Sequence, residues 1–153
     1  MTVDFGAMDS FGYRFFFVLH ILAIITAFAP AFVFPVMTAR LRRVDQTMGP
    51  EIGRVIRDNW NRIHGPALVL AGLFGIFMVL LSDEAFEFSQ SWVSIAFVLW
   101  FIMLGVVFGL LPWNERKAAE GNAGAEQRSA MFNGMLHLLL LLMVIDMVWK
   151  PGL

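Results

Sequence analysis

Cysteine is absent from the 153-residue chain, and charged residues make up only 15% of it. The lack of cysteine excludes disulfides, thiolate metal sites and a cysteine nucleophile. A net charge of −1 gives no basis for binding nucleic acid. Soluble domains usually contain about 25% charged residues, so the scarcity of charge points away from a soluble protein.

Apolar residues make up 59% of the chain, and the mean hydropathy is +0.72. They are concentrated in four runs, over about 13–39, 66–81, 92–111 and 130–149. A helix needs roughly 20 apolar residues to cross a bilayer, and these runs approach or exceed that length. We therefore predict an all-α integral membrane protein, an antiparallel four-helix bundle that forms one domain over residues 1–153.

The loops between these runs differ in charge. Nine of the eleven basic residues lie in the first and third loops: Arg40, Arg42, Arg43, Arg54, Arg57, Arg62, Arg116, Lys117 and Arg128. The second loop has no basic residue and contains Asp83, Glu84 and Glu87. Because basic loops stay in the cytoplasm, both termini should lie outside. Residues 51–63 are expected to form a short helix that lies on anionic lipid or docks a partner subunit.

Small residues recur every four positions in three predicted spans: Ala23, Ala27 and Ala31, then Ala67, Ala71 and Gly75, then Gly105 and Gly109. Lipid gives no hydrophobic drive for helices to associate, so small residues are expected where the helices pack closely. Pro30 and Pro35 each remove a backbone hydrogen bond from the first span, which should kink that helix.

His20 is the only ionisable residue between Phe15 and Ala39. A titratable side chain is costly at that depth, which makes it a functional candidate. Ala27 continues the face below it and leaves room for a flat or bulky ligand. We therefore consider His20 and Ala27 as cofactor-binding residues, with His20 as a ligand to haem iron or another metal. An interhelical hydrogen bond is the open alternative.

His137 in the fourth predicted span shares its face with Gly134. Both are further candidates for the cofactor site, and a purely structural role stays open here too. From the helical rise, His20 lies about 9 Å below the outer boundary and His137 about 20 Å below it. Two histidines that ligate one iron must lie at one depth, so this difference favours one histidine per site or two different roles.

Three other polar residues are expected to be structural. His64 lies at the predicted inner interface, where amphipathic rings are common. Asp146 and Lys150 are spaced as an i,i+4 ion pair near the outer surface.

The chain has ten methionines. Met131 and Met135 lie near His137, and a set of thioethers with an imidazole suits copper(I). Methionine is also a common filler of apolar interiors, and this second interpretation is favoured.

Three segments resemble one group of bacterial membrane proteins: LHILAIITAFAPAFVFP (19–35), RIHGPALVLAGLFGIFMVL (62–80) and VIDMVWKPGL (144–153). They are similar to parts of the superfamily that contains copper-resistance protein D and the membrane-embedded protoporphyrinogen oxidases. Within it, the chain looks most like an uncharacterised four-helix family, a domain of unknown function. The resemblance implies the bacterial cytoplasmic (inner) membrane and a haem ligand at His20. The third predicted span contains no Lys, Arg or His, unlike that of the oxidases, so oxidase activity is not implied.

Two functions follow from these patterns. The first is a protein that binds haem b or another porphyrin through His20 and has a redox or accessory role, not that of a stand-alone enzyme. The second is a non-catalytic structural or assembly subunit of a larger membrane complex or homo-oligomer, suggested by the small-residue faces and the basic loop over 40–65. A transporter is less favoured, because no inverted repeat accompanies the proline-containing span.

Overall fold

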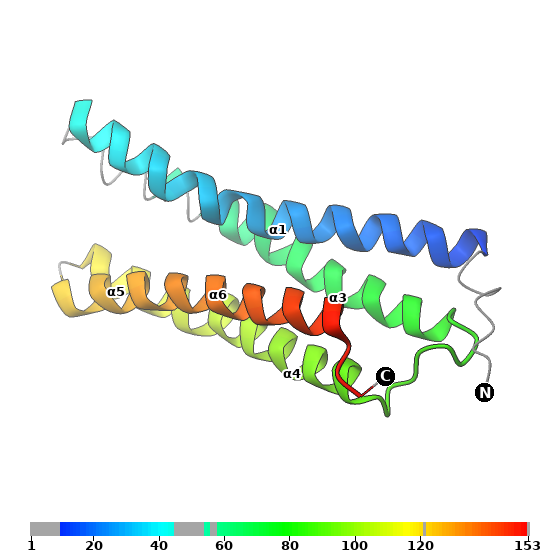
Figure 1. Ribbon diagram of the computed structural model, residues 1–153. Helices are drawn as coiled ribbons and strands as arrows, with labels where there is room; N and C mark the ends of the chain where they lie inside the picture. The colour runs from blue at the N-terminus through cyan, green and yellow to red at the C-terminus, as the bar shows by residue number, and fades with distance from the viewer. Residues whose placement is uncertain (1–9, 45–53, 56–57, 121, 153) are drawn as a thin grey trace.

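The structure is a computed structural model, and it describes residues 10–44, 54–55, 58–120 and 122–152. These residues are helical apart from short turns, and no strand occurs among them. The elements (Figure 1) are α1 (Phe11–Val44), the π-helical turn η3 (Trp60–His64), α3 (Gly65–Leu80), α4 (Ser91–Gly105), the π-helical turn η4 (Val106–Leu110), α5 (Leu111–Ala119) and α6 (Ala123–Trp149). The predicted all-α class is confirmed for this part of the chain.

Four helical stretches are long and apolar enough to cross a membrane. They are Phe11–Ala29, Trp60–Leu80, Ser91–Lys117 and Gln127–Trp149, with mean hydropathies of 1.8, 2.1, 2.6 and 2.0. At most 28% of the residues in the apolar window of any stretch are buried inside the protein. Most of their apolar side chains therefore face outward, as contact with lipid tails requires. The chain is a multi-pass membrane protein, as its apolar runs predict.

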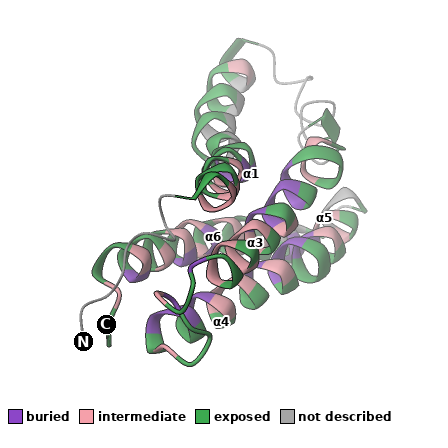
Figure 2. Cartoon of the chain, turned by 90° about the vertical axis from the view of Figure 1, so that its right-hand side faces the viewer, coloured by how far each residue is buried: buried purple, intermediate pink, exposed green. Residues whose placement is uncertain are grey.

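The helices pack mainly in two groups. α1 lies along α3, and α6 packs against both α4 and α5 (Figure 1). A core cluster that includes Ala27, Leu68, Met103 and Leu136 joins the two groups. Figure 2 shows buried residues on the faces that the helices turn toward one another and exposed residues on their outer sides. The start of α1 and the end of α6 lie toward the same end of the molecule.

Two helical stretches continue through a proline near a predicted boundary. Pro66 lies at the predicted start of the second span, and Pro112 lies just after the predicted end of the third. Pro66 lies two residues after η3, and Pro112 lies two residues after η4. A proline has no N–H for the carbonyl four residues back, and its ring clashes with that carbonyl. Both π turns end with an N–H that bonds five residues back, from Gly65 to Trp60 and from Leu111 to Val106. This wider turn accommodates the proline, so the two helices extend beyond the boundaries predicted at about 66 and 111.

The fourth helix begins before its apolar run. α6 starts at Ala123, where the side chain of Asn122 accepts a hydrogen bond from the Ala125 N–H at 3.1 Å. Arg128 Nε then donates to Asn114 Oδ1 of α5 at 3.0 Å. These polar contacts extend α6 beyond the boundary predicted at 130, because capping and ion-dipole contacts do not depend on hydropathy.

Small residues of the first two spans pack as predicted. Buried in α1 and α3 are Ala23, Ala27, Ala67 and Ala71. The side chain of Ala31 lies outside the described ones. The Gly105–Gly109 pair does not pack: among the described residues, no atom beyond its own surroundings in the helix lies within 4 Å of either Cβ position. The expected close contact of the third span through this pair is therefore wrong for the described part of the chain.

α1 runs without a break through Pro30 and Pro35, whose side chains lie outside the described ones. Pro30 cannot donate to the carbonyl of Thr26, four residues back. His64 of η3 takes its place, with Nδ1 donating to Thr26 O at 2.8 Å. The ring of His64 is buried. The expectation of an ordinary interfacial histidine is therefore replaced by a buried link between helices, while the kink in α1 stays a prediction.

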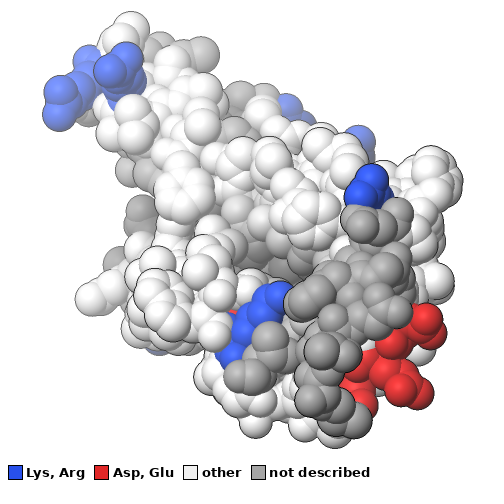
Figure 3. Space-filling view, turned by 45° about the vertical axis from the view of Figure 1, so that its right-hand side comes forward, with Lys and Arg blue, Asp and Glu red and all other residues white. Residues whose placement is uncertain are grey.

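Exposed charges lie mainly at the ends of the helices. Asp83, Glu84 and Glu87 are exposed in the turn between α3 and α4. Figure 3 shows acidic side chains gathered in one place, well apart from a basic group at the upper left. The helix predicted over 51–63 falls partly outside the described residues, and its final part enters η3.

Candidate cofactor site

A cavity of about 440 Å³ lies between α1, α3, α4 and α6. Pockets for small molecules and cofactors usually measure about 300–1,000 Å³, so the volume suits a ligand of that class. Phe28 and Met103 of the core cluster line one end of the cavity. The cavity extends from there to Lys150, the residue that follows α6.

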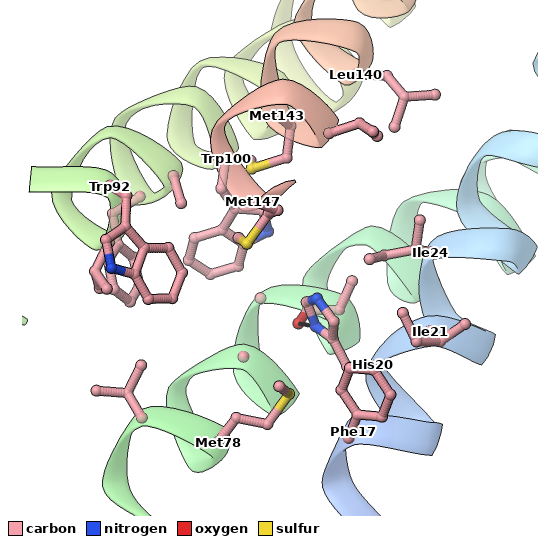
Figure 4. Close-up of a pocket in the computed structure, with 18 of the residues that line it drawn as sticks. Phe17, His20, Ile21, Ile24, Met78, Trp92, Trp100, Leu140, Met143 and Met147 are labelled. Atoms are coloured by element: carbon pink, nitrogen blue, oxygen red, sulfur yellow. Dashed lines mark hydrogen bonds between the residues drawn. The ribbon is translucent and has the colours of Figure 1, made fainter. Parts of the chain in front are cut away.

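His20 projects from α1 into this cavity (Figure 4). Its Nδ1 lies 2.7 Å from the carbonyl oxygen of Ala71 in α3. Because a carbonyl only accepts, Nδ1 carries the proton and donates it, and the neutral ring has its lone pair on Nε2. No described residue forms a hydrogen bond with Nε2. The ring is thus held in one orientation and keeps one nitrogen able to bind a metal.

Two glycines in α3 leave space for side chains of other helices to reach the backbone carbonyls of α3. One such side chain is that of His20, and the other is that of Trp100. Gly75 lies four residues after Ala71, and the Cβ of a residue at that position leans back toward the carbonyl of the earlier turn. The His20 ring occupies this side of Gly75, 3.5 Å from where a Cβ would lie. Gly72 has the same relation to Leu68, whose carbonyl accepts a hydrogen bond from Trp100 Nε1 at 2.9 Å. Gly75 belongs to the small-residue face predicted from the sequence. Gly72 was not predicted, although its three-residue spacing from Gly75 was a usable signal.

Methionine and aromatic side chains form much of the remaining wall. Met143 and Met147 enter from α6, and Met78 from α3 (Figure 4). Trp92 and Trp100 line the cavity from α4. Thioethers are soft, polarizable groups that pack well against rings. This wall therefore suits a flat, polarizable, mainly apolar ligand.

Lys150 brings a positive charge to the end of the cavity opposite Phe28 and Met103. Its backbone is left-handed, with φ of 43°, so its side chain leaves the direction of α6. Nζ lies 4.3 Å from the ring centroid of Phe86 and 5.2 Å from that of Trp92. Burial lowers the pKa of the Lys150 ammonium below its ordinary value. Within the described ranges, no carboxylate forms an ion pair with it.

The predicted ion pair between Asp146 and Lys150 is wrong. Asp146 is 5% exposed, and neither of its carboxylate oxygens has a hydrogen-bond partner in the described structure. The reason is the left-handed conformation of Lys150, which carries its ammonium group to the Phe86 and Trp92 rings instead of back along α6. The backbone N–H of Lys150 donates to the carbonyl of Asp146 at 2.8 Å.

His137 lies outside the cavity lining. Its ring packs edge-on against Phe32 of α1, with 5.2 Å between centroids, and its Nδ1 donates to Asn133 O at 2.7 Å. Phe32 is twelve residues beyond His20 on the continuous helix α1, a separation of about 18 Å along the axis. His20 and His137 are therefore too far apart to ligate one iron.

The remaining residues singled out in the sequence lie in different surroundings. Ala27 is 1% exposed in the core cluster, next to Phe28, which lines the end of the cavity opposite Lys150. Gly134 is on the exposed side of α6, with open space around its Cβ position among the described residues. Met131, near His137, is 59% exposed, and neither it nor Met135 lines the cavity. Of the four predicted cofactor residues, only His20 lines it directly.

The chemistry of the site is that of an anchored imidazole in an apolar, aromatic cavity with an ammonium group at one end. The residues that the structure describes contain no cluster of three or more His, Asp or Glu able to hold a metal ion. Comparison of the chain with protein-family models, curated proteins and solved structures finds no match. The function is therefore inferred from this geometry.

Proposed function

We propose that this membrane protein binds haem b, or a closely related porphyrin, in the cavity between α1, α3, α4 and α6, and serves as a redox or accessory component. The observation that carries the proposal is the bond from His20 Nδ1 to Ala71 O, which leaves Nε2 as the lone-pair nitrogen in an apolar cavity. A neutral imidazole can ligate iron there without the cost of burying a charge.

The donor set fits haem better than it fits a bare metal ion. A bare ion would find one imidazole and thioethers at the cavity wall. A porphyrin brings four nitrogen ligands of its own, so one protein ligand is enough. His20 would hold the iron, while Trp92, Trp100 and the methionines of α6 would pack against the macrocycle. Bound haem supplies a one-electron iron couple.

The test is the absorption spectrum of the protein purified in detergent after expression with added haem. We expect a Soret band in the wild type, its loss in His20→Ala, and its retention in the matched control His137→Ala. A colourless wild-type protein, or an unchanged band in His20→Ala, would contradict the proposal. The elution volume on gel filtration reports whether each variant is folded.

A structural subunit is the second candidate, and one pair of contacts favours it. His20 of α1 donates to a carbonyl of α3, and His64 of η3 donates to a carbonyl of α1. Both histidines thus link the same two helices, as structural histidines in membranes do. This function predicts that His20→Gln keeps the fold and that mild extraction recovers a stoichiometric protein partner. A colourless monomer without partners would contradict it.

The topology belongs to the same proposal. We infer an antiparallel four-helix bundle in the bacterial cytoplasmic (inner) membrane with both termini outside, and membership of the uncharacterised four-helix family that the sequence resembles. The support is the position of nine basic residues in the first and third loops and of Asp83, Glu84 and Glu87 in the second. Single cysteines placed at Ser89 and at Arg116 in this cysteine-free chain test it. A membrane-impermeant thiol reagent applied to intact cells should label only the first.

A further inference from the structure

We propose that Lys150 is the site at which the cavity recognises a carboxylate of its ligand, so that the two acidic side chains of a porphyrin point to the outer end of the protein. This inference rests on the proposed function and adds a second anchor to it. His20 would fix the centre of the macrocycle, and Lys150 its acidic edge.

The positions of the two residues suit one ligand. Tyr13 packs on the cluster of Phe86, Trp92 and Val93, and the ammonium of Lys150 lies over two rings of that cluster. Tyr13 is seven residues before His20 on α1, about 10 Å along the axis. The ammonium group is therefore about two helical turns from the imidazole, toward the Lys150 end of the same cavity.

The ammonium group also lacks an acid within the part of the chain that the structure describes. Asp146 lies four residues before Lys150 and is therefore the expected partner. Its carboxylate oxygens accept no hydrogen bond in the described structure. Asp83, Glu84 and Glu87 are exposed in the turn between α3 and α4. Contact with aromatic faces stabilises a lysine cation less than a hydrogen-bonded carboxylate does. A ligand carboxylate at this position would complete the contacts of a partly buried charge.

The apolar part of the cavity limits the ligand class. Between His20 and Lys150 the wall consists of groups such as Met147, Val93 and Trp92. A small inorganic anion would leave this wall without contacts, whereas a porphyrin with carboxylates on one edge would cover it. The geometry thus favours a flat amphiphilic acid.

The experiment uses metal-free protoporphyrin IX and its dimethyl ester, so that iron ligation by His20 plays no part. Each is titrated into the haem-free protein in detergent, and binding is followed by quenching of tryptophan fluorescence, since Trp92 and Trp100 line the cavity. Lys150→Gln is compared with Lys117→Gln, a matched control whose ammonium lies 4.6 Å from the Trp113 ring and outside the cavity.

In Lys150→Gln we expect the Kd for the free acid to rise at least about tenfold, the effect of losing one hydrogen bond to a charged group. The Kd for the dimethyl ester should not change, which also shows that the variant is folded. Lys117→Gln should bind both as the wild type does, and Lys150→Arg should restore binding of the acid.

Three results would overturn the inference: an unchanged Kd for the acid in Lys150→Gln, an equal loss for acid and ester, or a wild type that binds neither porphyrin. Failure of the proposed function is a separate outcome, because the wild-type protein would then show no Soret band after expression with added haem. A protein that binds haem, but in which Lys150→Gln changes the Kd for acid and ester by the same factor or leaves both unchanged, would refute only the role of Lys150.

Discussion

The imidazole of His20 lies against Gly75, and this contact gives its Nδ1 access to the carbonyl of Ala71 at 2.7 Å. The donor and acceptor are on different helices, so the bond both joins α1 to α3 and sets the tautomer of the ring. A structural role and a ligand role for His20 are therefore compatible. The bond uses Nδ1, and the proposed iron ligand is Nε2.

The glycines of α3 and α6 should respond differently to alanine. Gly72→Ala places a methyl group inside the Trp100 ring, and Gly75→Ala makes only ordinary contact with His20. We expect Gly72→Ala to destabilise the protein by about 1–3 kcal/mol, as overpacking does. Gly134→Ala, in open space, should stabilise α6 by up to about 1 kcal/mol. Thermal unfolding in detergent measures all three, and equal values for Gly72→Ala and Gly75→Ala would contradict the packing described.

His64 and Pro30 should be energetically coupled. His64→Ala leaves the Thr26 carbonyl without its donor, because Pro30 has no N–H to offer. We expect a loss of about 1–3 kcal/mol, because a backbone carbonyl in a membrane span has no water to replace the lost donor. In a Pro30→Ala background the helix supplies the missing N–H, so the same change should cost less. A double-mutant cycle by chemical denaturation in micelles checks this, and additive effects would argue against the link.

Removal of the Asp146 carboxylate should stabilise the protein. It is buried in the fourth span, and both of its oxygens lack hydrogen-bond partners in the described structure. A buried polar group without a partner costs about 1–3 kcal/mol, so Asp146→Leu should raise the midpoint of thermal unfolding. Glu120→Leu, at an exposed position after α5, is a control that should have little effect. A lowered midpoint in Asp146→Leu would instead show that the carboxylate has a partner of its own.

Binding of the acidic porphyrin should weaken at high pH. Burial lowers the pKa of Lys150, so its ammonium loses its proton at a lower pH than an ordinary lysine does. The contribution of Lys150 is present below that lowered pKa and is lost as the pH rises through it. Lys150→Arg keeps its charge in this range, so the variant should bind the acid at alkaline pH more tightly than the wild type. The titratable residues Tyr13 and Asp146 are the same in the wild type and in Lys150→Arg. A parallel decline of porphyrin binding in both proteins at high pH would therefore contradict this role of Lys150.

Sequence patterns were sufficient for those features that depend on composition. A helix in lipid must satisfy its own backbone hydrogen bonds, so four long apolar runs determine four helices whatever their neighbours are. Small residues at four-residue spacing similarly predicted that faces of the first two spans pack closely, without indicating which helix each one meets. The same rule was wrong for Gly105 and Gly109, because an outward-facing glycine pair has the same spacing as a packed one.

Only the tertiary structure decided how the polar groups are used. The π turns before Pro66 and Pro112 and the donation from His64 to Thr26 depend on which carbonyl each proline releases and on what lies nearby. The prediction of an ion pair between Asp146 and Lys150 was wrong because the left-handed backbone of Lys150 redirects its side chain. His20 was singled out as a lone titratable group in an apolar run. Its carbonyl partner, its cavity and the ammonium above it come from helices distant in sequence, and their meeting depends on packing and not on local pattern.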